Sequence, residues 1–220
     1  WNTGIHTALL ARWPSHITEG NRTDALVQYA DILPTLVDLA GGNPKAYPYD
    51  GRSFKASLLN NTNKHRKFVY GIHNNIPEGP PYPIRSVSDG EYHYIRNLLP
   101  AEIYMEKHLM GTRGNGSLNN PYWSTWIWDS WNTPRTYRLV KRFMHRPAEQ
   151  LYNINYDPYE MNNLANSKEH YKQLTKLRGE LDKWMNAQKD PGATVDTIEA
   201  IQASRKNKHL HGRDATKTIR

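Results

Sequence analysis

Residues 151–165 read LYNINYDPYEMNNLA, and this stretch decides how the second half of the chain folds. It begins with a short apolar run, which Asp157-Pro158 ends because proline fixes φ, lacks an N–H and disfavours the α region for the preceding residue. Glu160 and the Asn162-Asn163 pair then supply side-chain groups that hold backbone donors and acceptors in a tight loop. The stretch therefore predicts a strand, a turn and the approach to a helix, with its polar residues in structural roles.

The segment that follows, residues 169–188, has the spacing of an amphipathic helix. Apolar residues recur on one face with charged residues opposite, a pattern typical of a helix that covers a core. The positions that form this apolar stripe are Leu174, Leu177, Leu181, Trp184 and Met185.

Short apolar runs upstream of this helix predict the strands of a sheet. They lie at 68–71, 84–87 and 92–95, and Ser88-Asp89-Gly90 separates the last two. Asp-Gly between two such runs indicates a hairpin. With residues 150–154 as a further strand, we expect an antiparallel sheet of about four strands, covered by the long helix.

The first 45 residues show a different pattern of apolar residues. A mostly apolar run at 7–13 is typical of a strand buried on both faces of a parallel sheet, and a second run at 25–29 is a further candidate strand. Asp31 then supplies the N-cap of a short helix over 32–40, which Gly41-Gly42 ends. Strands and a helix of this kind, without preceding βα units, resemble the end of a larger α/β domain, so we expect the chain to begin within a domain.

The sequence predicts three regions: residues 1–45 as the end of the large domain, 46–190 as a C-terminal subdomain, and 191–220 as a basic extension. The subdomain has a long aromatic insert at about 100–147. Its aromatic side chains, interleaved with arginine, either stack on sugar rings or bases or fasten a loop onto the domain beneath, and fastening is favoured. The insert tryptophans are Trp123, Trp126, Trp128 and Trp131.

Composition sets wide limits on the partners. The 220 residues carry a formal net charge of +8 and no cysteine, which favours polyanionic partners and removes disulfides and Cys-ligated metal sites. No apolar run approaches the roughly 18 residues of a membrane span, and no nucleic-acid motif occurs, so we expect neither a membrane span nor a nucleic-acid partner. The histidines lack the spacing of a zinc site.

Five blocks occur in a fixed order: a Gly-Ile-His-Thr segment leading to Arg-Trp-Pro, then DILPTLVDLAG at 31–41, DGRSF at 50–54, YPIRSV at 82–87, and the stretch at 151–165. In this order they resemble the C-terminal part of the type I, formylglycine-dependent sulfatases, and most of all the heparan N-sulfatase (sulfamidase) branch. The resemblance covers residues 1 to about 190 and implies an alkaline-phosphatase-like α/β fold.

The resemblance implies hydrolysis of sulfate esters or sulfamates of sulfated glycans by a hydrated formylglycine, with Ca²⁺ polarising the sulfate. The Cys/Ser-x-Pro-x-Arg motif that yields formylglycine is absent. We therefore expect nucleophile and metal site upstream, and assign no catalytic residue and no metal ligand here. The implied partners are a sulfated glycan and the N-terminal catalytic part of the same protein, in a periplasmic, secreted or lysosomal location.

Two alternatives stay open. The chain is either part of a working sulfatase or a non-catalytic polyanion- or glycan-binding module on a degenerate sulfatase scaffold. The related fold also carries phosphatases and phosphonate hydrolases, which fold alone does not exclude. Within the enzyme class, a sulfated algal polysaccharide competes with heparan sulfate as the substrate, because the loop at 73–81 is rich in Pro and Asn.

The substrate-contact residues that the resemblance implies are His6, His73, Asn74, Glu78 and Arg85. His6 is expected to reach the sulfate or a hydroxyl, or else to bond backbone. His73 and Asn74 occupy the loop where relatives place sugar contacts, with a solvated loop as the alternative. For Arg85, a bidentate grip on a carboxylate or sulfate competes with a bridge between the subdomains, which is favoured. Glu78 is expected to accept from a sugar hydroxyl or amine.

Overall fold

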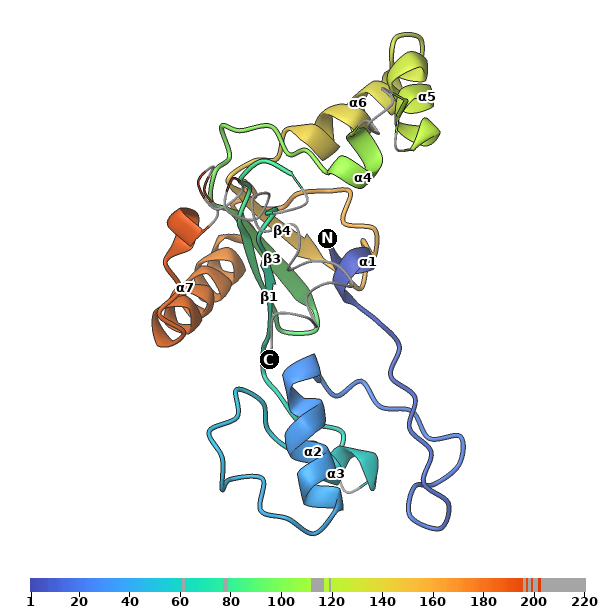
Figure 1. Ribbon diagram of the computed structural model, residues 1–220, viewed down its shortest axis with the longest axis vertical. Coiled ribbons are helices and arrows are strands. Elements are labelled where there is room, and N and C mark those ends of the chain that lie inside the picture. Colours follow the sequence, from blue (N-terminus) through green and yellow to red (C-terminus); the bar gives the residue numbers. More distant parts are fainter. Residues whose placement is uncertain are drawn as a thin grey trace, which may run out of the picture. The chain divides into compact units, whose positions relative to one another are not determined.

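The computed structural model describes residues 1–60, 62–76, 79–111, 117–118, 120–195, 197, 199 and 202. Figure 1 shows a small sheet and several short helices, with one long helix near the C-terminal end of the described chain. The elements are α1 (Asn2–Ile5), η1 (Tyr29–Asp31), α2 (Ile32–Leu39), α3 (Lys55–Leu58), β1 (Val69–His73), β2 (Ile84–Ser88), β3 (Tyr92–Asn97), α4 (Lys107–Met110), α5 (Pro121–Ser130), α6 (Pro134–Met144), β4 (Glu149–Asn153), α7 (Tyr171–Ala187) and η2 (Gly192–Val195).

Two compact units make up the chain, and their boundaries cut through the strands and α7. The first unit comprises Trp1–Gly71, Ser86–Tyr94 and Leu151–Leu181. The second comprises Ile72–Arg85, Ile95–Gln150 and Asp182–Arg220.

The four strands form one antiparallel sheet in the order β1-β2-β3-β4, which confirms the predicted sheet. Its central hairpin turns at Asp89 and Gly90. The backbone N–H of Asp89 donates to the carbonyl of Tyr92 at 3.1 Å, and Gly90 has φ +91°, which favours glycine. The Asp-Gly signal therefore marked the turn correctly.

The long helix α7 supplies part of the core of the first unit. Leu174, Leu177 and Leu181 of the predicted apolar stripe are all buried. On the polar side of the same helix, Gln173 and Lys176 donate to the Asp89 carboxylate at 2.8 and 2.9 Å, which fastens the helix to the β2–β3 turn. The strand residues buried most completely in this unit are Val87, Tyr94 and Leu151.

The strands expected at 7–13 and 25–29 are absent, and this expectation was wrong. Residues 7–13 and 25–28 run as irregular chain, Tyr29 begins η1, and the Leu10 side chain is 94% exposed. A strand requires a neighbour that completes its hydrogen-bond ladder, and no described strand pairs with either segment. An apolar run alone therefore does not make a strand.

No helix in the described ranges is long and apolar enough to cross a bilayer.

The helix α2 begins where the sequence predicts, but Asp31 does not cap it with its side chain. Its carboxylate is committed to other donors, described below. The first turn is instead held by the Thr35 hydroxyl, which donates to the Asp31 carbonyl at 2.6 Å.

Among its described residues the aromatic insert contains the helices α4, α5 and α6, whereas the sequence suggested a loop. The Asn120 side chain accepts from the N–H of Tyr122 at 2.9 Å and so caps α5, which starts with a proline as α6 does. Only Trp123 among the insert tryptophans is buried, with its ring 5.8 Å from that of Phe143. Fastening, the role that the sequence favoured, therefore describes Trp123 but not its exposed neighbours.

Candidate functional site

In the second unit, the Arg85 side chain on β2 is 1% exposed and makes several hydrogen bonds. Its guanidinium grips the carboxylate of Asp190 in a bidentate pair, with Nη2 donating to Oδ1 at 2.9 Å and Nε donating to Oδ2. The remaining nitrogen, Nη1, donates to Asn74 Oδ1 at 3.0 Å and to the Ile84 carbonyl at 2.9 Å. It also reaches the His73 carbonyl at 3.4 Å.

This arrangement joins Arg85 to a carboxylate of its own chain. The hydrogen bonds from Arg85 lower the pKa of Asp190, so the pair is ionised at neutral pH. A buried arginine whose guanidinium N–H groups are bonded within the protein holds its acceptor groups in fixed positions. Here those groups are the carbonyl of His73 and the side chain of Asn74, at the end of β1.

Asn74 is the exposed member of this cluster. Because a guanidinium only donates, the atom of Asn74 that faces Arg85 is its oxygen, and the amide nitrogen keeps two donors. The His73 ring is half-buried, with its centroid 5.9 Å from that of Tyr104. The structure thus brings His73, Asn74 and Arg85 together; their contact with a substrate remains a prediction.

The loop after β1 is held by the next residue, Asn75, which is fully buried. Its amide nitrogen donates to the carbonyls of Pro80 and Met105, both at 2.7 Å. At Gly79 a Cβ would lie 2.1 Å from the Met105 carbonyl oxygen, so only glycine fits. Glu78, the remaining loop residue predicted to contact substrate, lies outside the described residues.

An aromatic cluster borders the His73 ring, and sequence reasoning missed it. Tyr82 and Tyr104 meet edge to face at 5.3 Å, and the Arg146 guanidinium lies 3.6 Å from the Tyr104 ring centre. Burial raises the pKa of both tyrosines and lowers that of Arg146. Tyr104 and Arg146 stand near the two ends of the insert, and no spacing pattern links them.

His6 belongs to the first unit, where it ends α1. Its backbone N–H donates to the Asn2 carbonyl at 2.8 Å, and its side chain is exposed. Its predicted contact with sulfate remains a prediction.

Glu160, from the stretch that opened the sequence analysis, is a fully buried structural centre of the first unit. Its carboxylate lies 2.5 Å from Nδ1 of the buried His93 and accepts the backbone N–H of Asn2 at 2.6 Å. Its backbone has φ +54°, a conformation that favours glycine. The side chain of Glu160 thus compensates for its strained backbone, which agrees with the structural role expected for this stretch.

Asp31 is a second buried centre, also in the first unit. Its carboxylate accepts the backbone N–H groups of Gln28 and Arg52 at 2.9 and 2.8 Å. It also accepts from Arg66 in a bidentate pair, with Nε at 2.6 Å, and lies 3.1 Å from His65 Nε2. Burial alone would raise the pKa of Asp31, but the hydrogen bonds outweigh it and hold the pKa at about 2. Burial lowers the pKa of His65.

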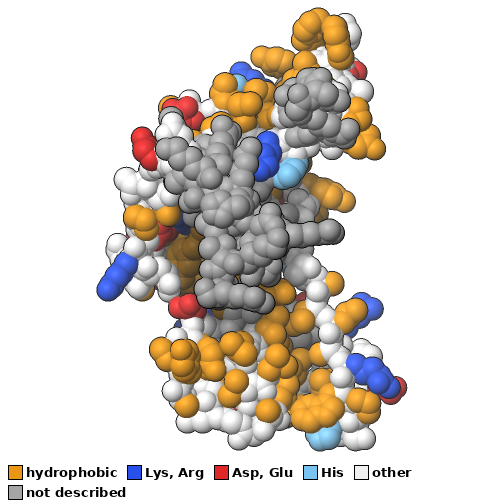
Figure 2. Space-filling view, viewed as in Figure 1, with side chains coloured by type: hydrophobic (Ala, Val, Ile, Leu, Met, Phe, Trp, Pro, Cys, Tyr) orange, Lys and Arg blue, Asp and Glu red, His pale blue; other side chains and the backbone are white. Residues whose placement is uncertain are grey.

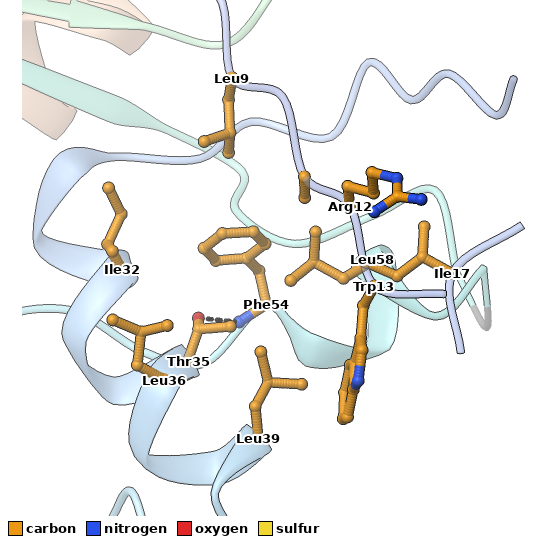
Figure 3. Close-up of a pocket in the computed structure, with 11 residues that line it drawn as sticks. Leu9, Arg12, Trp13, Ile17, Ile32, Thr35, Leu36, Leu39, Phe54 and Leu58 are labelled. Atoms are coloured by element: carbon orange, nitrogen blue, oxygen red, sulfur yellow. Dashed lines mark hydrogen bonds between the residues drawn. The ribbon is translucent and has the colours of Figure 1, made fainter. Parts of the chain in front are cut away.

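An apolar hollow of about 420 Å³ lies beside α2 (Figure 3). The hollow contains no carboxylate and only one cation, Arg12, among its lining residues. Such a lining suits apolar surface, and its one hydroxyl, that of Thr35, is already bonded to the Asp31 carbonyl and the Phe54 N–H. In Figure 2, hydrophobic side chains gather over the α2 and α3 region.

The described residues do not fit a calcium site. They contain no group of three or more His, Asp or Glu side chains able to hold a metal ion. Ca²⁺ takes six to eight oxygen ligands, and the buried carboxylates of Asp31, Glu160 and Asp190 are each bound by cations or N–H donors of the protein. We therefore derive no step through calcium or formylglycine.

Comparisons with known proteins cover most of the chain. Residues 1–105 match the family model described as N-sulphoglucosamine sulphohydrolase, C-terminal. Two curated proteins from Formosa agariphila, both described as ulvan-active sulfatases, are similar. One is 31% identical over 191 residues, covering 85% of this chain and 34% of its own length. The other is 27% identical over 198 residues, covering 85% and 30%.

The chain thus spans about a third of the length of these curated relatives. A solved structure described as being in complex with its substrate, D-glucosamine-2-N,6-O-disulfate, aligns with 82% of this chain and 28% of its own, at TM-score 0.53 and 20% identity. That likeness concerns the fold. Together these matches confirm the predicted fold and the predicted family resemblance.

Proposed function

The chain carries, over residues 1–105, the C-terminal domain of an N-sulphoglucosamine sulphohydrolase-like sulfatase, and from this premise we propose that the protein hydrolyses sulfate esters or sulfamates of a sulfated glycan. The observation that supports this most strongly is the family match together with the 31% identity to an ulvan-active sulfatase. The role proposed for this chain is to contribute part of the substrate pocket.

The substrate class we propose is a sulfated polysaccharide of the ulvan type. The two curated relatives are described as active on ulvan and are 31% and 27% identical. The structure described with a sulfated glucosamine is 20% identical, so its likeness supports the fold alone. Calcium, formylglycine and a periplasmic, secreted or lysosomal location remain predictions from the resemblance.

The pocket residue that we propose for this chain is Asn74, with His73 beside it. Arg85 fixes the Asn74 oxygen, so the amide nitrogen presents its donors in a set direction. A preset donor suits recognition of a sugar hydroxyl or sulfate oxygen, because little ordering entropy is lost on binding. Arg85 itself acts by positioning Asn74, since its Nε and Nη2 donate to the Asp190 carboxylate.

The test is release of inorganic sulfate by the intact protein, measured by ion chromatography with ulvan, ulvan oligosaccharides and N-sulfated glucosamine as substrates. We expect sulfate from the ulvan substrates. In Asn74→Ala we expect KM to rise roughly tenfold, the effect of losing one well-placed polar contact. The matched control is Asn166→Ala, another exposed asparagine, which should leave KM unchanged.

Two outcomes count against the proposal. An intact protein that binds ulvan but releases no sulfate from any of the three substrates would favour the alternative, a polyanion-binding module on a degenerate scaffold. Release of sulfate with an unaltered KM in Asn74→Ala would remove the loop after β1 from the pocket and leave the sulfatase assignment standing.

A further inference from the structure

The helical hairpin of α5 and α6 exposes aromatic rings to an unusual degree. Trp128 and Trp131 are 63% and 72% exposed, and Trp126 is 46% exposed. Tryptophan is normally highly buried, and exposed clusters of large apolar side chains mark binding surfaces. Figure 2 shows hydrophobic side chains gathered over this part of the molecule.

The exposed rings are arranged, not scattered. Trp128 and Trp131 lie three residues apart on adjacent turns, and their ring centroids are 4.8 Å apart at an interplanar angle of 62°. The ring centroid of Trp126 lies 6.2 Å from that of the buried Trp123, so the Trp126 ring packs against a fixed neighbour. The rings are therefore held in place before any ligand arrives, which lowers the entropic cost of binding.

The second helix of the hairpin supplies positive charge. On α6 the exposed residues include Arg135, Arg138 and Lys141, spaced three apart along the helix, and Arg142 follows. The helix sequence contains no Asp or Glu. Its opposite face packs inward through half-buried residues such as Val140 and Phe143, so the cations form the outer face.

Only one carboxylate lies on α5, that of Asp129. It accepts the hydroxyls of Thr133, at 2.8 Å, and of Thr136, across the turn between the helices. These hydrogen bonds lower the pKa of Asp129. Asp129 thus serves to close the hairpin, and the charge on the outer face of α6 is uniformly positive.

We propose that the exposed rings of α5 and the turn after it, together with the exposed cations of the adjoining α6, bind the chain of a sulfated polysaccharide in addition to the loop after β1; we call these residues the hairpin surface. The C–H face of a sugar ring meets the electron-rich face of an indole, while Arg and Lys engage sulfate or carboxylate groups. The ligand class rests on the proposed function, and charge complementarity is the argument for a polyanion. The residues that define the surface are Trp126, Trp128, Trp131, Arg135, Arg138 and Lys141.

A lipid membrane fits this surface less well. A helix that lies in a membrane interface presents an apolar face opposite its cations. On α6 the half-buried Val140 and Phe143 lie away from the cations, and among its large apolar side chains Tyr137 and Leu139 are exposed. The exposed tryptophans stand on α5 and the turn after it, not on the helix that carries the cations. Anionic vesicles and single-stranded nucleic acid therefore enter the test as competing ligands.

The test is affinity electrophoresis of the intact protein in native gels that contain ulvan, desulfated ulvan or neither, with binding to phosphatidylglycerol vesicles and to single-stranded DNA measured in parallel. Two variants alter the surface: Trp128→Ala/Trp131→Ala and Arg135→Ser/Arg138→Ser/Lys141→Ser. Their matched controls alter other exposed residues: Tyr156→Ala/Tyr159→Ala and Lys67→Ser/Lys168→Ser/Lys172→Ser.

We expect ulvan to retard the protein and each surface variant to raise the dissociation constant roughly tenfold or more, as loss of aromatic or arginine anchors does. The control variants should stay within about twofold. The charge variant should also flatten the salt dependence of binding.

Three results would overturn the inference: surface variants retarded as strongly as their controls, preference for vesicles or DNA over ulvan, or no retardation in a protein that releases sulfate. Retardation by ulvan does not require catalysis, so the two proposals can fail separately. If the protein releases no sulfate but is retarded by ulvan, and the surface variants lose this retardation, the proposed sulfatase activity is wrong and the hairpin surface is supported. All variants replace exposed residues, so a melting temperature matching the wild type verifies folding.

Discussion

The cluster around Asp31 and the hairpin surface use the same chemistry in opposite ways. At Asp31 the charge is fully buried, and arginine, histidine and backbone donors surround it. On the hairpin surface, arginine, lysine and tryptophan side chains are exposed, and the charge has a single sign. Residue type does not separate the two regions, but burial and pairing do.

The difference separates architecture from recognition. A buried, saturated ion cluster cannot meet a ligand without leaving a charge unpaired, so its contribution is to hold elements in place. An exposed set of rings and cations contributes little to stability but keeps its binding capacity. Arg85 lies between these cases, because it is buried and paired yet orients the exposed Asn74.

The largest effect that we expect is on removing the central carboxylate. In Asp31→Ala the Arg66 guanidinium and the N–H groups of Gln28 and Arg52 lose their acceptor. We expect the free energy of unfolding to fall by about 3–5 kcal/mol, the cost of a buried partner left alone. Urea denaturation measures it, with the exposed Asp24→Ala as control. Equal effects in the two variants would remove the distinction drawn above.

The tryptophans of the insert allow a comparison within one hairpin. Trp123→Ala should lower the free energy of unfolding by about 3 kcal/mol, because it removes a buried ring packed on Phe143. Trp128→Ala should change it by less than about 0.5 kcal/mol. Thermal unfolding of the two variants side by side measures the contrast, and a comparable loss in Trp128→Ala would show that its ring packs against something.

The pH dependence of stability follows from the same cluster. The pKa of Asp31 is about 2 in the fold against an ordinary value of 3.8, so its contribution is complete above about pH 4 and is lost as the pH falls toward 2. The difference amounts to about 2 kcal/mol. Because burial lowers the pKa of His65, stability should begin to decline once the pH falls below about 6.5.

The measurement is urea denaturation between pH 3 and pH 7 for the wild type and Asp31→Asn. The gap in unfolding free energy between the two proteins should narrow as the pH falls below about 4. A gap that stays constant with pH would mean that Asp31 titrates normally in the fold.

The smallest effect is a difference between two substitutions at one position. Glu160→Ala and Glu160→Gly both lose the bonds to His93 and to the Asn2 N–H, but only alanine keeps the strain of φ +54°. Glycine should therefore be more stable than alanine here by about 1 kcal/mol. Denaturation midpoints decide, and alanine equal to or better than glycine would contradict the strain.

The elements that local chemistry determines were predictable from the sequence. The Asp-Gly turn, the leucine stripe of α7 and the strand expected at 150–154 each require only neighbouring residues, and each was confirmed within one or two residues. The Asp157-Pro158 pair does not itself end that strand, because β4 stops at Asn153, four residues earlier. The runs at 7–13 and 25–29 failed because a strand depends on a distant partner, which local apolarity does not reveal.

The candidate site was predictable only in part. His73, Asn74 and Arg85 were found because the resemblance marks their segments, and the structure brings them together. Asp190, the carboxylate that fills the fork of Arg85, is 105 positions away in sequence and carries no motif. Pairings of that kind depend on the tertiary fold.

Release of inorganic sulfate by the intact protein tests the central claim most directly. The account predicts that the protein frees sulfate from ulvan or its oligosaccharides, and that Asn74→Ala weakens turnover of the oligosaccharides while Asn166→Ala does not. Absence of sulfate from ulvan, its oligosaccharides and N-sulfated glucosamine alike, with a folded protein confirmed by its melting curve, would contradict the account.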